Sequence, residues 1–598
     1  MRQIVLRGTV VHGDGRGRQL GFPTANIKVE GSVLPEFGVY EVEVASKLLS
    51  RRRAVCNVGR RPTIEGSKDI HVEVHIPDFS GDLYGQRLTV AFSRRLRGEK
   101  KFDSLDDLKA QIREDVAALN RTPWSLFAAL GAAVAIAYGL TLAGPFVIDD
   151  IGFVRDNAVF RLPFGDFLRA LFSADYFRLT GERTYQPLVT FLHYFIHASP
   201  LACRASGLLI HAFNAVLVFL LCRKLRAGER SSFLAALLFA LFPASTEAVN
   251  VSAFKGHTLS FTFSAASLLL WSSPQSLIFY ALALLSKETA LIVPVFAATE
   301  TFFRPAPERK RRIAPLLGIA ALTAAYLAVR LLILAPAPMM PLHYSPLSSL
   351  SWYLKMFLAP SPLCLAHGTD LAPAPMIVLP LLFFAGLLAE RRRVFNLACL
   401  SWILISLLPV LHLVPFREFN PVSDRYLYMA SAGFCALAAR TLWRPRGHWL
   451  LYGVIAAWGI LTLRRNALYL DPGALYEQTA ACAPDVPQAQ TLLGDFDLSA
   501  GDFAGARESY RKALLLDSRQ SEALENVGVA EFMSGDAKNA RRSLERAAGA
   551  EPRSSRANFN LGRFYASEGQ TAKARSYYEK ALKLDPSYAP ARAALNAP

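Results

Sequence analysis

Apolar residues follow three different patterns along this chain of 598 residues. In residues 1–120 they alternate with charged residues over short stretches, and from about residue 124 to residue 463 they form long uncharged runs. After Asp471 the chain is polar again and rich in Ala, Glu, Arg and Lys. A chain of this length is expected to hold more than one domain. We therefore predict three structural units, which we call the head (1–120), the body (121–468) and the tail (469–598).

The pattern of the head predicts strands. Residues 39–44, 70–76 and 88–92 alternate or are continuously apolar with many β-branched side chains, and glycine turns separate them. Residues 105–116 have a helical pattern instead. A small closed all-β barrel accommodates several short strands of this kind. Because no apolar signal segment follows Met1, we expect the head to remain in the cytoplasm, where ATP is found.

The long runs of the body predict a polytopic α-helical membrane domain. Runs long enough to cross a bilayer begin near residues 126, 205, 233, 313, 374, 394, 426 and 450. We interpret residues 259–303 as three shorter crossings, broken at 272–274 and at 286–288, because one helix over residues 275–303 would place the basic residues 309–312 outside. This interpretation gives about eleven crossings, with the head inside and the tail outside.

The tail has an internal repeat. Small residues recur at the same interval in three series: Gly494, Gly528 and Gly562; Ala506, Ala540 and Ala574; and Ala513, Ala547 and Ala581. The interval matches the roughly 34-residue tetratricopeptide unit. We predict an α-helical solenoid with repeats at 487–520, 521–554 and 555–588, preceded by a half repeat that contains Tyr476. Stacked repeats of this type form a concave surface for peptides or protein partners.

The net charge is +18, and the positions of the basic residues decide how it is interpreted. Basic residues lie in short clusters between apolar runs, at 223–224, 309–312 and 391–393, which is typical of cytoplasmic loops of membrane proteins. Nucleic acid is therefore not an expected partner. The seven Cys residues are scattered without metal or redox spacing, so neither a zinc site nor a disulfide framework is predicted.

Ionisable residues lie at the predicted outer ends of the body's crossings, where a functional role is the default interpretation. Asp149 and Asp150 follow the first crossing, and Lys255, Lys287 and Arg425 lie at later ones. When a hydroxyl displaces a sugar from a lipid phosphate, the reaction needs a base such as a carboxylate. The leaving phosphate needs cations. The alternatives are a solvated loop with helix caps at Asp149 and Asp150, and a structural ion pair between Lys287 and Glu288.

Six motifs of the body resemble a known family. They are Ile148-Asp149-Asp150 with Arg155-Asp156-Asn157, Tyr185-Gln186-Pro187-Leu188, His211-Ala212-Phe213-Asn214, Phe242-Pro243 with Thr246-Glu247-Ala248-Val249, Ser286-Lys287-Glu288-Thr289, and Asp424-Arg425-Tyr426-Leu427-Tyr428. In this order, and with the repeat tail, they resemble the transmembrane-and-tetratricopeptide O-mannosyltransferases, which have the GT-C fold. The resemblance implies a glycosyltransferase that uses a polyprenyl-phosphate sugar on the outer face, with Asp149 or Asp150 as catalytic base. The sequence departs from the family at Lys255-Gly256-His257 and at Asp424.

The head contains a basic glycine turn, Gly13-Asp14-Gly15-Arg16-Gly17-Arg18, whose backbone N–H groups and arginines suit a phosphate. It is followed in order by Gly21-Phe22-Pro23-Thr24-Ala25-Asn26, Gly38-Val39-Tyr40, Asn57-Val58-Gly59, Val72-Glu73-Val74-His75-Ile76, Asp82-Leu83-Tyr84-Gly85 and Arg95-Leu96-Arg97. This ordered series resembles riboflavin kinase over the whole head.

The resemblance implies that the γ-phosphate of ATP is transferred to the 5′-hydroxyl of riboflavin. Glu73 would be the catalytic base, and Thr24 and Asn26 would hold Mg²⁺ and phosphate. The turn residues Gly15, Arg16, Gly17 and Arg18 would cover the phosphates of ATP. The side chains of Arg97, Glu99 and Phe102 would close over the flavin. Because no FMN-adenylylating segment precedes Met1, FMN is the expected product.

The expected chain is thus an integral protein of a bacterial inner membrane, with a cytoplasmic head and an extracytoplasmic tail. Its expected partners are riboflavin, ATP with Mg²⁺, a polyprenyl-phosphate sugar, membrane lipid and a protein acceptor held by the repeats, and no cofactor is assigned to the body. Three alternatives remain open from sequence. The head could be a catalytically silent flavin or nucleotide sensor, the body could be an inert scaffold, or the fusion could result from genome rearrangement or misassembly.

Overall fold

The structure, a computed structural model, divides the chain into two compact units, Met1–Trp124 and Ser125–Pro598. The predicted boundary between body and tail falls inside the second unit, between two of its helices. The structure describes residues 5–13, 15, 17, 20–30, 34–46, 49, 52–60, 70–79, 81–100, 102, 104–119, 124–173, 176–180, 184–225, 227–271, 273–302, 306–333, 346–368, 393–411, 422–443, 447–586 and 588–596.

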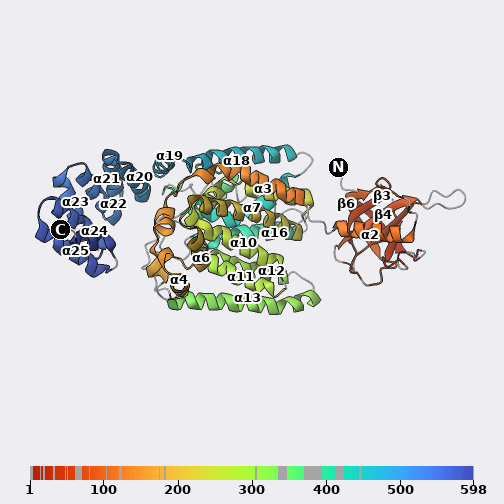
Figure 1. The fold of residues 1–598 in the computed structure, drawn as a ribbon. Helices are drawn as coiled ribbons and strands as arrows, with labels where there is room; N and C mark the ends of the chain where they lie inside the picture. The colour runs from red at the N-terminus through yellow and green to blue at the C-terminus, as the bar shows by residue number, and fades with distance from the viewer. Residues whose placement is uncertain are drawn as a thin grey trace. The chain divides into compact units, whose positions relative to one another are not determined.

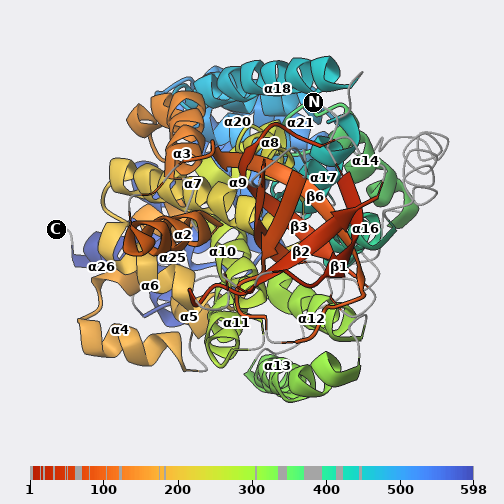
Figure 2. The ribbon, with the colours of Figure 1, turned by 90° about the vertical axis from the view of Figure 1, so that its right-hand side faces the viewer.

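The first unit is a closed antiparallel barrel with the strand order β1-β2-β5-β4-β3-β6, and its strands are seen in Figure 2. The strands are β1 (Val5–Val11), β2 (Thr24–Val29), β3 (Gly38–Ala45), β4 (Arg52–Arg60), β5 (Ile70–His75) and β6 (Arg87–Arg97), and one helix follows, α2 (Leu105–Leu119). Alternate residues point inward, so that Val42, Val44, Leu88 and Val90 are completely buried. The predicted small barrel is confirmed.

The second unit is helical throughout its described part (Figure 1). The helices of the body are α3 (Trp124–Tyr138), α4 (Phe164–Leu171), α5 (Tyr176–Thr180), α6 (Pro187–Ile196), α7 (Pro200–Lys224), α8 (Glu229–Ala240), α9 (Thr246–Asn250), α10 (Lys255–Leu269), α11 (Gln275–Ser286), α12 (Val293–Phe302), α13 (Ala306–Ile333), α14 (Pro346–Leu358), α16 (Arg393–Leu407), α17 (Leu427–Leu442) and α18 (His448–Leu468). Short turns of helix join them: η1 (Gly139–Ala143), η2 (Asp150–Arg155), η3 (Ala158–Arg161), η4 (Pro243–Ser245), η5 (Ser252–Phe254), η6 (Glu288–Ile292), η8 (Leu408–Val410) and η9 (Asp424–Tyr426). Both views place α13 and α18 on opposite sides of the body (Figures 1 and 2).

Among the described residues, three helical stretches are long and apolar enough to cross a membrane. They lie within Leu105–Ala143, Pro200–Lys224 and Arg312–Arg330, and the bent pair Glu229–Ala240 with Pro243–Asn250 would be a fourth. The predicted number of about eleven crossings is not confirmed. One reason is that the apolar runs are interrupted: α10 ends at Leu269 and α11 at Ser286, close to both predicted breaks, so the pieces are short. The run predicted near residue 374 lies outside the described residues.

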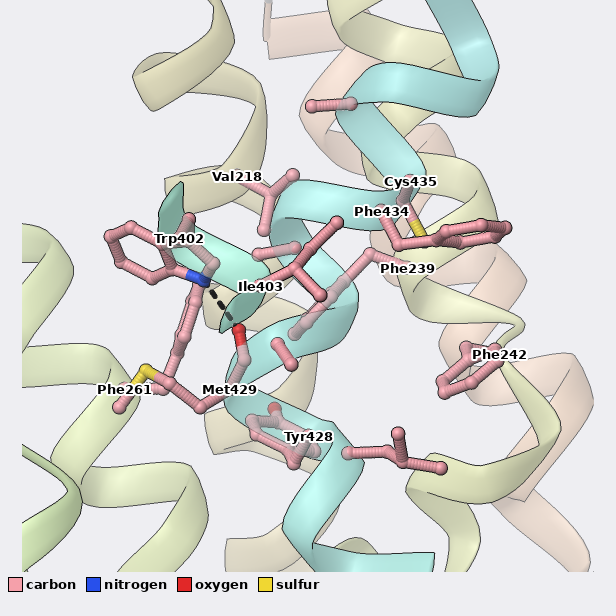
Figure 3. Packing of buried hydrophobic residues seen from close by; sticks show 14 of the residues in the cluster. Val218, Phe239, Phe242, Phe261, Trp402, Ile403, Tyr428, Met429, Phe434 and Cys435 are labelled. Carbon is pink, nitrogen blue, oxygen red and sulfur yellow. Dashed lines mark hydrogen bonds between the residues drawn. The ribbon is translucent and has the colours of Figure 1, made fainter. Parts of the chain in front are cut away.

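The core of the body joins helices that are far apart in sequence (Figure 3). The Trp402 indole N–H of α16 donates to the backbone oxygen of Met429 in α17 at 2.6 Å. Gly433 allows this close contact, because a Cβ there would lie 2.8 Å from the backbone oxygen of Cys399. Tyr428 in α17 has ring contacts with Phe239 of α8 and Phe261 of α10.

The tail is a stack of helix pairs, as the repeat predicted. Its helices are α19 (Pro472–Cys482), α20 (Pro487–Ala500), α21 (Phe503–Leu516), α22 (Ser521–Met533), α23 (Ala537–Ala550), α24 (Ser555–Ser567), α25 (Thr571–Leu584) and α26 (Ala589–Asn596). The three repeat glycines lie where the helices of a pair cross. A Cβ would meet Tyr510 at Gly494, Leu544 at Gly528 and Tyr578 at Gly562, each at less than the normal contact distance.

Two glycines of the same repeat give opposite expected effects on stability. At Gly528 a Cβ would lie 2.8 Å from Leu544 Cγ and 3.1 Å from the Leu544 backbone nitrogen, so Gly528→Ala should cost about 1–3 kcal/mol by overpacking. Gly549 in α23 has nothing within 4 Å of an added Cβ, so Gly549→Ala should stabilise by about 0.4–1 kcal/mol. Hydrogen exchange of α22 and α23 in the full chain measures both changes. Equal effects of the two substitutions would contradict this packing.

Cys364 and Cys482 form a disulfide between the loop that follows α14 and the last residue of α19. The sequence suggested no disulfide framework, so this bond was not predicted. The two residues are 118 positions apart, and only folding brings them together, so their spacing in sequence carries no signal. The five other cysteines are buried and free.

Candidate functional site

Three polar residues form a row across the outer face of the barrel. Strand register places Glu73 of β5 opposite Asn26 of β2 on one side and opposite Asn57 of β4 on the other. Their neighbours along the strands, Ile27 and Val74 among them, are buried in the barrel core. Since successive strand residues point to opposite faces, the row points outward. Glu73 is half-buried at its centre.

The glycine turn lies against the β2 end of this row. A Cβ at Gly13 would lie 2.0 Å from Asn26 Nδ2, and one at Gly17 would lie 2.9 Å from Thr24 Oγ1. The Phe22 N–H donates to the Gly17 backbone oxygen at 2.8 Å and fixes the approach of the turn. Only glycine allows backbone this close to the two side chains. The predicted phosphate residues Arg16 and Arg18 lie outside the described residues, whereas Gly15 has a φ of 69° beside the site.

The opposite end of the row is formed by the segment after β6. A Cβ at Gly59 would lie 2.2 Å from Glu99 Oε1 and 3.9 Å from Asn57 Nδ2, so the Glu99 carboxylate extends over β4 beside Asn57. Arg97, the last residue of β6, is bound to Asp115 of α2 with 2.8 Å between Nη2 and Oδ2. Its guanidinium carbon lies 5.5 Å from the centre of the Phe102 ring.

Two of these residues were missed from sequence. Asn57 had no assigned role, and its place beside Glu73 follows from strand register alone. Asp115 is 5 % exposed in a helix whose other charges face solvent. Because Asp115 neutralises Arg97, Arg97 acts in this structure as a tether that holds α2 near Phe102.

The chemistry of the row suits phosphoryl transfer. Thr24 Oγ1 and Asn26 Oδ1 are hard oxygen donors of the kind that Mg²⁺ prefers, and Mg²⁺ needs few protein ligands when substrate phosphates supply others. The described residues hold no cluster of three or more His, Cys, Asp or Glu that could bind a metal. A carboxylate such as Glu73, on the strand next to the one that contacts the glycine turn, can accept a proton from a hydroxyl placed there.

In the body, the motifs quoted above contact one another. The Tyr428 hydroxyl lies 2.9 Å from His211 Nδ1, and Asn214 Nδ2 donates to it at 3.0 Å. The Glu247 carboxylate accepts hydrogen bonds from the Arg425 backbone N–H at 2.8 Å and from Arg425 Nη1 at 2.7 Å. Residues about two hundred positions apart are thereby joined in buried networks.

The two residues of the predicted acidic pair, Asp149 and Asp150, differ in how deeply they are buried. Asp150 is 1 % exposed, whereas Asp149 is half-buried. Asp150 Oδ1 accepts a hydrogen bond from the Ala253 N–H at 2.8 Å, and its Oδ2 is buried without a hydrogen-bond partner among the described residues. Burial raises the pKa of the Asp150 carboxyl to about 6, although the charges of Arg204 and Lys255 act in the opposite direction. A carboxylate with such a pKa is suited to act as a base near neutral pH.

The predicted cations differ in how they are held. Lys255 is completely buried, and its Nζ donates to Ser252 Oγ, which also lies 3.1 Å from His193 Nε2. Arg425 forms an ion pair with Glu247, and its guanidinium carbon lies 4.2 Å from the centre of the Phe254 ring.

Lys287 is half-buried, and a Cβ at Gly256 would lie 3.4 Å from its Cδ. Its neighbour Glu288 forms an ion pair with Arg330 of α13 at 3.3 Å and also interacts with the charge of Lys287. Arg204 of α7 was missed, because it directly precedes the apolar run predicted to begin near residue 205. It is 2 % exposed and donates to the backbone oxygens of Asn250 at 2.7 Å and Pro145 at 2.6 Å.

Comparison with known proteins supports both ends of the chain. Residues 1–122 match the family model described as riboflavin kinase, and residues 491–541 and 528–589 match a tetratricopeptide repeat model. Three similar curated proteins carry the name bifunctional riboflavin kinase/FMN adenylyltransferase.

The Haemophilus influenzae protein is 49% identical over 109 residues, which are 18% of this chain and 35% of that protein. The Pseudomonas fluorescens protein is 47% identical over 117 residues, which are 20% and 37%. The Escherichia coli protein is 46% identical over 112 residues, which are 19% and 36%. The chain thus spans little more than a third of the length of these relatives. The matches give no support to the glycosyltransferase resemblance of the body.

Proposed function

We propose that the head, a domain of the riboflavin kinase type, transfers the γ-phosphate of ATP to the 5′-hydroxyl of riboflavin and forms FMN. The observation that carries this proposal is the row of Asn26, Glu73 and Asn57 with the glycine turn at one end. The row brings the glycine turn, a carboxylate and two amides together on one face of the barrel, where two substrates could meet. The named relatives support the same activity.

The residues of the row divide the work of phosphoryl transfer. The turn through Gly15 and Gly17 would hold the phosphates of ATP with backbone N–H groups. Thr24 and Asn26 would hold Mg²⁺, which supplies charge neutralisation on the transferred phosphate when bound. Glu73 would orient the ribityl hydroxyl and take its proton as the new O–P bond forms. Little further chemistry is required, because positioning and charge neutralisation account for most of the catalysis of this reaction class.

The flavin would lie at the opposite end of the row. Phe102 offers a ring face to the flat isoalloxazine, and the Arg97–Asp115 ion pair holds the segment that carries it. Glu99 and Asn57 would contact the polar ribityl chain.

Purified full chain incubated with riboflavin, ATP and Mg²⁺ should yield FMN, measured by chromatography. Riboflavin binding without any FMN would overturn the kinase proposal in favour of a flavin sensor.

We propose further that the body lies in a membrane and transfers a sugar from a polyprenyl phosphate to a hydroxyl on the outer face. The buried Asp150 beside Arg204 and Lys255 supports this proposal, as do the contacts between the family-like motifs. In the proposed step the acceptor oxygen bonds to the anomeric carbon, and the bond from that carbon to the phosphate oxygen breaks. The acceptor proton passes to Asp150, and the lipid phosphate leaves. A single displacement inverts the anomeric carbon.

The disulfide supports the proposed sidedness. Disulfides persist in oxidising compartments such as the bacterial periplasm and are rare in the cytoplasm. The Cys364–Cys482 bond would therefore place α19 and the tail outside. The head, whose substrate ATP is cytoplasmic, would lie inside together with the basic clusters.

Two experiments, proteolysis and thiol labelling, test this topology in cells. Protease added to right-side-out cells should digest the tail and spare the head. A membrane-impermeant thiol reagent applied after denaturation should leave two cysteines unlabelled until a reductant is added, and Cys364→Ser should release Cys482 for labelling. Protection of both ends from protease, with Cys364 and Cys482 reduced, would contradict the proposed sidedness.

A further inference from the structure

Ile148 has an unusual backbone conformation directly before the acidic pair. Its φ is 51°, in the left-handed region that a β-branched residue rarely adopts. Such a conformation costs free energy and persists only where surrounding contacts enforce it. The structure identifies one such contact: the Ile148 N–H donates to the Tyr476 hydroxyl at 2.9 Å. Tyr476 belongs to α19, the first helix of the tail.

An apolar cluster surrounds this hydrogen bond. Val147, Leu475 and Tyr469 are completely buried in it, and Tyr476 is 6 % exposed. Ile148 itself lies at the edge of the same cluster. The segment that leads into Asp149 and Asp150 therefore shares a core with α19. Its backbone oxygens at Val147 and Ile148 also accept hydrogen bonds from the N–H groups of Asp150 and Ile151.

α19 is fixed to the body at two further points. Cys482, its last residue, is bonded to Cys364 in the loop after α14. Gln478, two residues after Tyr476, accepts a hydrogen bond from Arg465 of α18. With these tethers α19 cannot move away from the acidic pair without breaking a covalent bond or a buried contact.

We propose that α19 is a positioning element of the acidic site and that the Tyr476 hydroxyl holds the turn that buries Asp150. The tail then helps to form the acidic site and also offers a surface for partners. A catalytic effect of Tyr476 rests on the proposed glycosyl transfer. The structural coupling between Tyr476 and Asp150 does not depend on that reaction.

The coupling has a measurable consequence at Asp150. The charged and titratable groups around its carboxyl are Arg204 and Cys203 of α7, Lys255 of α10, the adjacent Asp149 and Tyr476 of α19. Desolvation is the largest cause of the raised pKa of Asp150. When the turn at Ile148 loosens, water reaches the carboxylate, and its pKa should move down toward the ordinary value of an aspartate.

The variant Tyr476→Phe tests the inference because it removes the hydroxyl and keeps the ring. Tyr565→Phe is the matched control, since the Tyr565 hydroxyl donates to Glu545 at 2.8 Å in a distant repeat. Hydrogen exchange of residues 145–156, resolved by fragmentation, should show the Ile148 amide exchanging about tenfold faster in Tyr476→Phe only. An infrared titration of the carboxyl band that disappears in Asp150→Asn should show an apparent pKa lower by roughly half a unit or more. An Ile148 amide and a titration identical to wild type would overturn the inference.

The amount of glycan on outer-surface proteins tests this inference and the proposed reaction independently. If Asp150→Asn abolishes glycan and Tyr476→Phe lowers it at least tenfold, with Tyr565→Phe unchanged, Tyr476 positions a catalytic group. If Asp150→Asn leaves glycan unchanged, the glycosyl transfer is refuted, and the two physical measurements alone decide the coupling. If glycan is lost in Asp150→Asn but is at the wild-type level in Tyr476→Phe, the positioning role is refuted and the reaction stands.

Discussion

The substitution Glu73→Gln should lower FMN formation by the full chain about 10²–10⁴-fold, the usual effect of losing a general base. Glutamine keeps the shape of the side chain and can still hydrogen-bond to the ribityl hydroxyl, but it cannot take the hydroxyl proton. Asn26 and Asn57 on the flanking strands offer no substitute, because an amide is not a base at neutral pH. Initial rates of FMN formation, measured by chromatography at saturating riboflavin and Mg-ATP, give the effect on kcat.

Glu43 of β3 provides the matched control. It is also a half-buried barrel glutamate, and it lies four residues along the strand from Val39, the register partner of Asn57. Glu43→Gln should leave FMN formation within about twofold of wild type, because surface substitutions away from a site have small effects. A Glu73→Gln protein that forms FMN at the wild-type rate would refute the assignment of Glu73 as the base.

The second large effect is expected from Asp150→Asn, which should reduce glycan on outer-surface proteins to the level of a deletion strain. The asparagine side-chain oxygen can still accept the hydrogen bond from the Ala253 N–H, but the amide cannot act as the base. The adjacent carboxylate, Asp149, is less buried than Asp150. Mass spectrometry of surface glycopeptides from complemented deletion strains measures the loss.

Asp166 in α4 serves as the control for charge in the same loop. It pairs with Arg169 at 3.5 Å, and its side chain is 58 % exposed. Asp166→Asn should leave surface glycan unchanged, with equal amounts of full-length protein in the membrane fraction. An unchanged glycoproteome in both the Asp150→Asn strain and the deletion strain would mean that the body is not a glycosyltransferase.

The fold of the head could be predicted because alternation of apolar and polar residues is a local signal. The site was only partly predictable, because its geometry depends on which strands become neighbours. The chain order gives no hint that β5 lies between β2 and β4, and this order alone brings Asn57 beside Glu73. Asp115 was missed for a related reason: its partner Arg97 reaches it from another element.

The body shows where local patterns mislead. The apolar run predicted to begin near residue 205 gave no role to the preceding Arg204, yet Arg204 is inside α7 and buried. The motif residues Glu247 and Arg425 were assigned separately, and their ion pair became visible only when α9 and η9 were brought together. The repeats of the tail were predictable in detail because each repeat carries the same small residues at the same helix crossing.

The pairing of β1 with β6 has a consequence for synthesis on the ribosome. The first strand of the head cannot gain its second neighbour until residues 87–91 of β6, with which it is in register, have been translated and released. From then on the barrel has no open edge that could pair with another nascent chain. Domains generally fold as units in N-terminal order during translation. The head should therefore be completely folded while the chain that follows Trp124 is still being synthesised, and ribosome-bound chains stalled within the body should already make FMN if the proposed kinase activity is correct.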